Sequence, residues 1–291
     1  SAEAKAAADA IAKPTISAEA GILYDVTNGR VLFEKNADEK LAPASTTKLM
    51  TALLVLEKAN LDDKVTFSKT AVTNLESGAV KIGLVEGDQV SVKDSLYALL
   101  LKSANEVANG LAEHVSGSIS AFAELMNARA AELGCTNTHF VNPNGLNSDQ
   151  QYTTCRDMAK IALACYANPT YRQIADTVSY ELPATNVHPA RTVTTTNRLL
   201  QPGSGYYRSY AHGMKTGFTT QAGRCFVTFA RQDGHTYGLV ILGSNSQNIF
   251  REAAELFDWA FTSPELHPAP AKPEAEPEKH GLSAFWHKVF G

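Results

Sequence analysis

The chain has 291 residues, of which 44% are apolar and 19% are charged, and its formal net charge is −4 at pH 7. This composition is typical of a folded globular protein, and an acidic balance without a run of Lys or Arg argues against nucleic acid as a partner. No apolar stretch reaches the roughly 18–20 residues that a membrane-spanning helix requires, so none is expected.

The first elements are a hairpin and a buried helix. Two β-rich runs between Ala20 and Glu34 are separated by Thr27-Asn28-Gly29, which predicts a tight turn. The stretch from Leu41 to Glu57, LAPASTTKLMTALLVLE, predicts a helix after Pro43. Its apolar residues occupy most of the circumference, so we expect the helix to be buried on nearly all sides.

The middle of the chain is predicted to be mainly helical. Short β-like pieces, VTFS and VKIGL, precede it between Lys64 and Asp94, and helical patterns follow from Ser95 to Gly134, with a second helix near Phe122 to Leu133. HFVNPNGL is predicted to be a loop because of its Asn-Pro and Asn-Gly pairs, and Tyr152 to Tyr166 a helix.

The last part returns to strands. The predicted elements are a ribbon from Val178 to Thr196, strands at Gly213–Phe218, Arg224–Arg231 and Tyr237–Ser244, and a closing amphipathic helix at Ser246–Phe261. We therefore expect an α/β (α+β) fold, in which strands from both chain ends form one antiparallel sheet flanked by helices, with a helical subdomain beside it.

The composition changes abruptly after Ser263. The predicted organisation is an N-terminal extension (1–17), one folded domain (18–263), a Pro/Glu-rich linker (264–280) and a short amphipathic tail (281–291). The alanine-rich start resembles a mature terminus beyond a removed signal. The tail is either a helix that lies on a membrane surface or a disordered end, and it is too short to span a bilayer.

Metal and disulfide chemistry have no support in the sequence. The four cysteines form no C-x-x-C pair, no histidines stand at zinc-ligand spacing, and H-E-x-x-H is absent. Mostly free thiols are expected, with the pairing of Cys135 left open. No metal or cofactor is predicted.

The first chemical motif is S-x-x-K at Ser45 and Lys48. Residues three apart on a helix share a face, so a hydroxyl would lie beside an amine. A lysine becomes a base when burial or a second cation lowers its pKa, and a helix N-terminus offers N–H groups to an oxyanion. The alternative is that Ser45 caps the helix and Lys48 is exposed in its first turn.

Two further motifs carry similar groups. Ser103-Ala104-Asn105 stands at a predicted loop-to-helix junction, where a hydroxyl could relay a proton and an amide could bind a substrate carbonyl or steady Lys48. Helix capping would also explain this pair.

The third motif is Lys215-Thr216-Gly217, at the start of the C-terminal strands. Lys215 and Thr216 could hold a carboxylate, and Gly217 would leave room where a substrate adds to the strand. The alternative is a plain edge strand with an exposed lysine and a bulge at the glycine.

The order S-x-x-K, S-x-N, K-T-G is more specific than any one motif, and it is similar to the set found in penicillin-binding proteins and class A β-lactamases. The chain resembles the low-molecular-mass penicillin-binding proteins, the serine D-Ala-D-Ala carboxypeptidases. Segments such as GILYDVTNGRVLFEKNADEKLAPASTTKLMTALL and HGMKTGFTTQAGRCFV also resemble that family, and the likeness extends over about Ala18 to Phe261.

The resemblance implies a role for each motif residue. Ser45 would be acylated by the penultimate D-alanine of a peptidoglycan stem peptide, with Lys48 as the base. Ser103 and Asn105 would shuttle protons and hold substrate.

The same resemblance assigns the substrate's terminal carboxylate to Lys215 and Thr216. The backbone N–H groups of Ser45 and Phe218, the residue after Gly217, would form the oxyanion hole. Arg198 lies in a segment that in many relatives brings an arginine to this carboxylate, but here it is displaced by about two positions.

The resemblance also implies β-lactams as inhibitors and an extracytoplasmic place in a bacterial envelope, with membrane attachment of the full-length protein. No E-x-x-L-N pattern lies between Asn105 and Lys215, which argues against a class A β-lactamase. An endopeptidase that cuts D-Ala cross-links stays open. A catalytically inactive wall-binding domain would lack one of the motifs.

Overall fold

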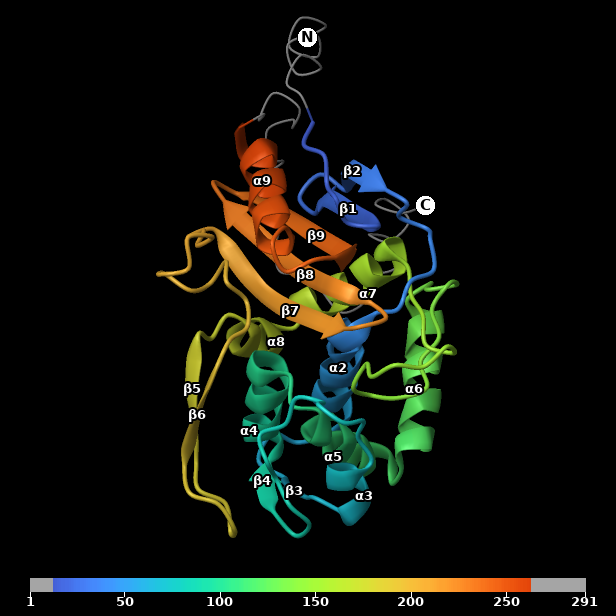
Figure 1. The fold of residues 1–291 in the computed structure, drawn as a ribbon, viewed down its shortest axis with the longest axis vertical. Helices are drawn as coiled ribbons and strands as arrows, with labels where there is room; N and C mark the ends of the chain where they lie inside the picture. Colours follow the sequence, from blue (N-terminus) through green and yellow to red (C-terminus); the bar gives the residue numbers. More distant parts are fainter. Residues whose placement is uncertain (1–12, 263–291) are drawn as a thin grey trace, which may run out of the picture.

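The structure is a computed structural model that describes residues 13–262, so the predicted linker and tail lie outside the described residues. Its central element is a five-stranded antiparallel sheet with strand order β2-β1-β9-β8-β7. The first two strands of the chain therefore lie beside the last three, and the predicted sheet is confirmed (Figure 1). The strands are β1 (Ala20–Asp25), β2 (Arg30–Lys35), β7 (Ala211–Thr219), β8 (Gly223–Gln232) and β9 (His235–Ser244).

Helices cover both faces of this sheet, and the helical region extends below it (Figure 1). Helix α9 packs on β8 and β9 from one side, whereas α2, α7 and α8 pack from the other. The helical elements are a 3₁₀ turn η1 (Ala44–Thr47), α2 (Lys48–Lys58), α3 (Lys69–Thr73), α4 (Val92–Tyr97), a π-helical turn η2 (Ala98–Lys102), α5 (Asn105–Ser116), α6 (Ile119–Glu132), α7 (Cys155–Ala167), α8 (Pro169–Ala175) and α9 (Ile249–Thr262).

Two small ribbons complete the fold. Strands β3 (Lys64–Thr66) and β4 (Gln89–Ser91) pair antiparallel, and so do β5 (Ser179–Leu182) and β6 (Arg191–Thr194), where a ribbon was predicted. All four cysteines are free and buried.

The folded domain includes residues before the predicted start at 18. Ile16 is buried in the core beneath α9, and the Ser17 N–H donates to the Glu252 carboxylate at 2.5 Å. The Lys35 ammonium also donates to the carbonyls of Ile16 and Ala18. These contacts attach the incoming chain to the edge of the sheet.

The prediction of a β-like piece at VKIGL was wrong. The N–H groups of Ile82 and Gly83 donate to the Glu106 carboxylate at 2.7 and 2.9 Å instead of to a strand, and Gly83 has a left-handed φ of +84°. The helix predicted from Tyr152 begins at Cys155, because Tyr152 bridges His139 and the Thr154 hydroxyl caps the helix. The first difference reflects a tertiary partner that a local pattern does not contain, whereas the second combines the bridge to His139 with a local cap at Thr154.

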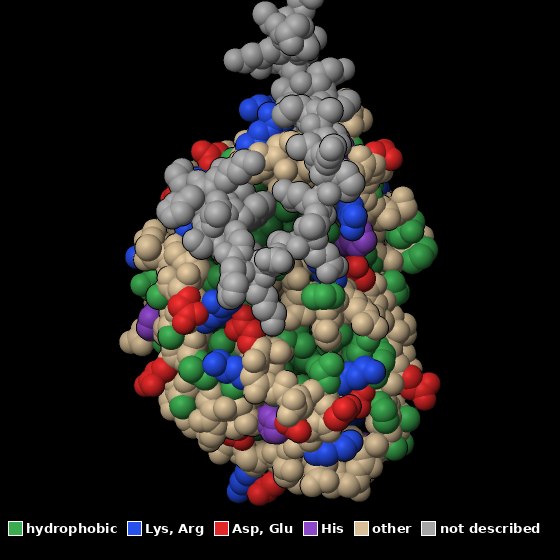
Figure 2. All heavy atoms as spheres, turned by 180° about the vertical axis from the view of Figure 1, so that it is seen from behind, with side chains coloured by type: hydrophobic (Ala, Val, Ile, Leu, Met, Phe, Trp, Pro, Cys, Tyr) green, Lys and Arg blue, Asp and Glu red, His purple; other side chains and the backbone are tan. Residues whose placement is uncertain are grey.

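Helix α2 is buried over most of its length, as predicted. Every residue from Lys48 to Val55 is buried, including the lysine. On the surface that Figure 2 shows, acidic and basic side chains of the described residues are interspersed rather than gathered by sign. Charge of a single sign is instead concentrated in the cavity described below.

Candidate active site

Ser45 and Lys48 meet where the 3₁₀ turn η1 runs into α2. The Lys48 ammonium donates to the Ser45 Oγ at 2.9 Å, to the Asn105 Oδ1 at 2.8 Å and to the Asn144 carbonyl at 2.5 Å. The three protons of the ammonium are thus matched by three neutral acceptors. When the amine is neutral, its lone pair can accept the Ser45 proton over the same contact.

The electrostatics of this cluster favour a neutral amine. Lys48 is fully buried, and its pKa lies well below the ordinary value, first because of burial and then because of the positive charge of Lys215. The Glu106 carboxylate acts in the opposite direction. Burial also lowers the pKa of Lys215 to about 7. The alternative of an exposed first-turn lysine is therefore wrong.

The loop around Asn144 supports the cluster from below. Gly145 has a φ of +87°, and a Cβ placed on it would lie 1.9 Å from the Ala44 carbonyl oxygen. Only a glycine allows this loop to approach the Ser45 turn so closely. The Asn144 amide donates to the Asn109 Oδ1 at 2.9 Å, which ties the loop to α5. The carbonyl that faces Lys48 is therefore held in place from two sides.

Ser103 and Asn105 stand at the η2 to α5 junction, as predicted. Ser103 has a left-handed φ of +64° and Ala44, next to Ser45, has a φ of +46°; such backbone costs of order 1–3 kcal/mol per residue and tends to cluster at functional sites. The Asn105 amide donates to the Val80 carbonyl at 3.0 Å while its oxygen accepts from Lys48. Asn105 therefore connects the lysine to the loop that Glu106 holds.

Lys215, Thr216 and Gly217 lie on β7, the edge strand of the sheet beside η1. The buried Lys215 ammonium donates to the Thr216 carbonyl at 2.7 Å, and the Thr216 hydroxyl is 2.5 Å from that of Thr196. The structure gives a further reason for the glycine. A Cβ on Gly217 would lie 2.8 Å from the Ser45 nitrogen, so the glycine makes room for the η1 backbone.

A cavity of about 790 Å³ opens over these groups. Of the predicted site residues, six line it together: Ser45, Ser103, Arg198, Thr216, Gly217 and Phe218. Lys48, Asn105 and Lys215 lie buried behind its wall. The Phe218 side chain is 52% exposed, and the Arg198 guanidinium is stacked over the Tyr206 ring at 4.7 Å.

The fold and this arrangement define a serine peptidase of the penicillin-binding type. Residues 7–246 match the family described as Peptidase_S11, D-alanyl-D-alanine carboxypeptidase. The chain belongs to this family of serine-type D-alanyl-D-alanine carboxypeptidases, and the resemblance found in the motifs is confirmed.

Individual relatives agree with this assignment. The chain is 35% identical over 283 residues to D-alanyl-D-alanine carboxypeptidase DacC of Escherichia coli, over 93% of this chain and 67% of DacC. It is 32% identical to DacF of Bacillus subtilis, over 86% of this chain and 64% of DacF. The crystal structure of the Streptomyces K15 DD-transpeptidase matches with a TM-score of 0.79 and 33% identity, over 87% of this chain and all of the other. Proteins named D-alanyl-D-alanine endopeptidase are also among the relatives.

The sequence did not indicate four residues that the structure places at the site. Asn144 contributes a backbone carbonyl, Thr196 a hydroxyl, Glu106 a carboxylate and Arg224 a guanidinium at the cavity wall. Of these four, only Asn144 had a local signal: its Asn-Pro-Asn-Gly sequence predicted a loop, but not that the loop would contact Lys48. In the described part of the chain, no group of three His, Cys, Asp or Glu side chains could hold a metal ion, and no helix is long and apolar enough to cross a membrane.

Proposed function

We propose that this protein removes the terminal D-alanine from peptidoglycan stem peptides through an acyl-enzyme on Ser45. One observation carries the proposal: a fully buried amine, Lys48, is hydrogen-bonded to the Ser45 hydroxyl at 2.9 Å and is surrounded by neutral acceptors and a second lysine, Lys215. Burial and the nearby positive charge of Lys215 lower the pKa of Lys48, so its neutral form becomes accessible, and a neutral amine in this position is a base.

In the first half-reaction, the Ser45 proton moves to the Lys48 nitrogen while the Ser45 Oγ attacks the carbonyl carbon of the penultimate D-alanine. The oxyanion accepts hydrogen bonds from the N–H groups of Ser45 and Phe218. Their placement is supported by the close approach of Gly217 to the Ser45 nitrogen, which brings the two segments together. The C–N bond then breaks, and the leaving amine takes a proton from Lys48, relayed by the Ser103 hydroxyl.

In the second half-reaction, a water molecule gives a proton to Lys48 and attacks the acyl carbon. The ester bond to the Ser45 Oγ breaks, the serine regains its proton, and the shortened peptide leaves. Asn105 keeps Lys48 in place through both steps. The Thr216 hydroxyl, paired with Thr196, binds the substrate's terminal carboxylate, and the buried Lys215 supplies positive charge from behind the cavity wall.

The same site is proposed to react with β-lactams, whose amide is opened by Ser45 in place of the peptide bond. Members of this family are bacterial cell-wall enzymes, so we place the protein at the outer face of the cell membrane. We also propose that the tail (281–291), which lies outside the described residues, binds a membrane surface.

The test is the intact mass of the protein after incubation with benzylpenicillin, for the wild type and Ser45→Ala. We expect one adduct per chain that decays slowly and that Ser45→Ala lacks, together with D-alanine release from an acylated D-Ala-D-Ala peptide. Rapid destruction of penicillin without an adduct would indicate a β-lactamase instead. If folded protein shows neither result, the site assignment is wrong.

A second candidate is endopeptidase activity on D-Ala cross-links, because relatives with that name also match the chain. The two activities are separated by comparing the rates on a monomeric stem pentapeptide and on a cross-linked peptide dimer. A carboxypeptidase prefers the monomer.

A further inference from the structure

The charged side chains that line the cavity all have the same sign. They are Lys102, Arg198 and Arg224, and no acidic residue lines the cavity. Within residues 13–262, none of the three forms an ion pair, although the chain as a whole is acidic. Unpaired cations around a cleft attract and hold an anionic ligand.

The two arginines each donate one side-chain hydrogen bond and differ in which nitrogen donates it. The Arg198 Nη2 donates to the Ser204 carbonyl at 3.2 Å, and the group is stacked on Tyr206, a residue of the same loop. The Arg224 guanidinium lies over the Phe218 ring at 4.5 Å, and its Nε donates to the Ser246 Oγ at 3.1 Å. Its two terminal nitrogens have no hydrogen-bond partner among the described residues.

The register of the sheet places Arg224 beside the carboxylate-binding part of the site. On the β7–β8 ladder, Phe218 is opposite Arg224 and Thr216 is opposite Phe226. Thr216 and Phe218 are two apart on β7 and share one face, so Arg224 is the diagonal neighbour of Thr216. Such neighbours lie about 7–8 Å apart, which a long side chain can bridge.

We propose that Arg224, rather than Arg198, provides the guanidinium that holds the carboxylate of the substrate's terminal D-alanine, together with the Thr216 hydroxyl. The proposal rests on the proposed function. A guanidinium offers two parallel N–H groups to a carboxylate, and the Phe218 ring and Ser246 orient this one before substrate arrives. Arg224 stands on the central sheet, whereas Arg198 stands on a loop, so Arg224 is the more rigid of the two.

This assignment also accounts for the displacement of Arg198 noted in the sequence. The arginine that many relatives bring from the segment before β7 is turned toward its own loop here. A guanidinium from β8 reaches the same cavity from the other side of Thr216. Arg224 is thus a specificity residue, because it binds the group that distinguishes a free peptide end from an amidated one.

The test compares kcat/KM for an acylated D-Ala-D-Ala peptide with kcat/KM for the same peptide with a C-terminal carboxamide. A hydrogen bond to a charged group corresponds to about 10–100-fold. We expect Arg224→Gln to lower kcat/KM for the carboxylate peptide by about this factor and to change the carboxamide peptide less than about twofold. Arg224→Lys keeps the positive charge but not the two parallel N–H groups, so it should recover part of the lost kcat/KM.

Arg231→Gln is the matched control, because it removes the same charge from the exposed far end of β8, outside the cavity, and we expect less than about a twofold effect on either peptide. Arg198→Gln removes a charge from the cavity itself, and we expect it to affect the carboxylate peptide less than Arg224→Gln does. An equal loss on both peptides in Arg224→Gln would overturn the proposal, since it would indicate a structural role. A larger selective loss in Arg198→Gln would overturn it too. Thermal melts check folding, and Arg224→Met, which keeps the apolar stem over Phe218, replaces Arg224→Gln if that variant is unfolded.

The proposed function and this inference fail in different ways. If wild-type protein forms no penicillin adduct at Ser45 and releases no D-alanine, the proposed function fails and the inference with it. If the wild type is active and prefers the carboxylate peptide, but Arg224→Gln keeps that preference, only the inference fails.

Discussion

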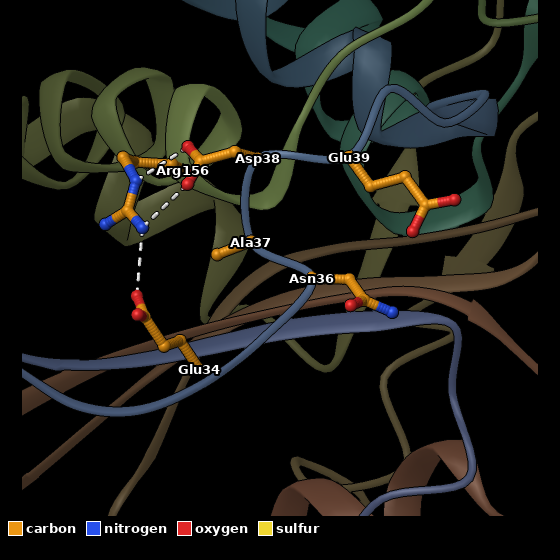
Figure 3. Close-up of a pocket in the computed structure, with 6 residues that line it drawn as sticks. All are labelled: Glu34, Asn36, Ala37, Asp38, Glu39 and Arg156. Carbon is orange, nitrogen blue, oxygen red and sulfur yellow. Dashed lines mark hydrogen bonds and ion pairs between the residues drawn. The ribbon is translucent and has the colours of Figure 1, made fainter.

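Two charged clusters in this protein are built in opposite ways. At the surface hollow of Figure 3, the Arg156 guanidinium donates two hydrogen bonds to the Asp38 carboxylate, at 2.8 and 3.0 Å, and one to Glu34 at 2.9 Å. Its charge is neutralised, and the acidic side chains are more than half exposed. In the active site, Lys48 is buried and binds only neutral oxygens.

The difference lies in what each arrangement does to proton affinity. Hydrogen bonds from Arg156 lower the pKa of Asp38 and raise that of Arg156 itself, so both groups stay ionised. Burial and the nearby Lys215 lower the pKa of Lys48, so its neutral form becomes accessible. A surface ion pair of this kind contributes little to stability, whereas an unpaired buried amine is costly to stability and useful for catalysis.

The largest expected effect comes from disturbing the neutral acceptors of Lys48. Gly145→Ala places a Cβ against the Ala44 carbonyl in a backbone conformation with φ +87°. The left-handed backbone alone costs about 1–2 kcal/mol, and the loop that carries the Asn144 carbonyl must move. We expect acylation by benzylpenicillin to be slower by about 100-fold, since small displacements of catalytic groups have effects of that size. Stopped-flow acylation rates and thermal melts measure both effects.

Gly117→Ala is the matched control for this change. Gly117 ends α5 with a similar φ of +79°, but nothing lies within 4 Å of the position of its Cβ. The Gly117→Ala variant should lose a similar ~1–2 kcal/mol of unfolding free energy because of its left-handed backbone. Its acylation rate should stay within about twofold of the wild type. Equal rate losses in the two variants would show that lower stability, and not the position of Asn144, slows the reaction.

A smaller effect is expected from removing the negative charge near Lys48. The Glu106 carboxylate raises the pKa of Lys48, so Glu106→Gln should lower it further. Acylation requires neutral Lys48, and the rate therefore rises as pH increases through the pKa of this lysine. The acid limb of the rate profile should move to lower pH in Glu106→Gln. The glutamine carbonyl can still accept the N–H groups of Ile82 and Gly83.

Glu113→Gln removes an equal charge from the same helix, at a side chain that accepts from Ser68, and should leave the acid limb in place. Acylation rates between pH 5 and 9 compare the variants. If the acid limb of Glu106→Gln stays at the wild-type pH while KM for the peptide substrate rises, Glu106 only holds the loop at 82–84.

The sequence predicted those parts of the site that depend on local spacing. The spacing of Ser45 and Lys48 and the strand predicted at Gly213–Phe218 depend on a few neighbouring residues, and the structure has a helical turn and a strand at these places. The role of the Asn144 carbonyl could not be predicted, because every residue has a backbone carbonyl and no side chain identifies this one. Arg224 meets Phe218 only through the β7–β8 register, and the close approach of Gly217 to the η1 turn joins two segments that are distant in the sequence. These contacts join distant segments, so they required the structure.

The smallest effect is expected at the surface cluster. Arg156→Gln removes all three hydrogen bonds to Asp38 and Glu34, yet it should lower the free energy of unfolding by less than about 1 kcal/mol, because exposed ion pairs are screened by solvent. Chemical denaturation at low and high salt measures this, and the difference from wild type should shrink as salt increases. Acylation should be unchanged. A loss of several kcal/mol would show that Arg156 stabilises the junction between β2 and α7, which would remove the contrast between the two clusters.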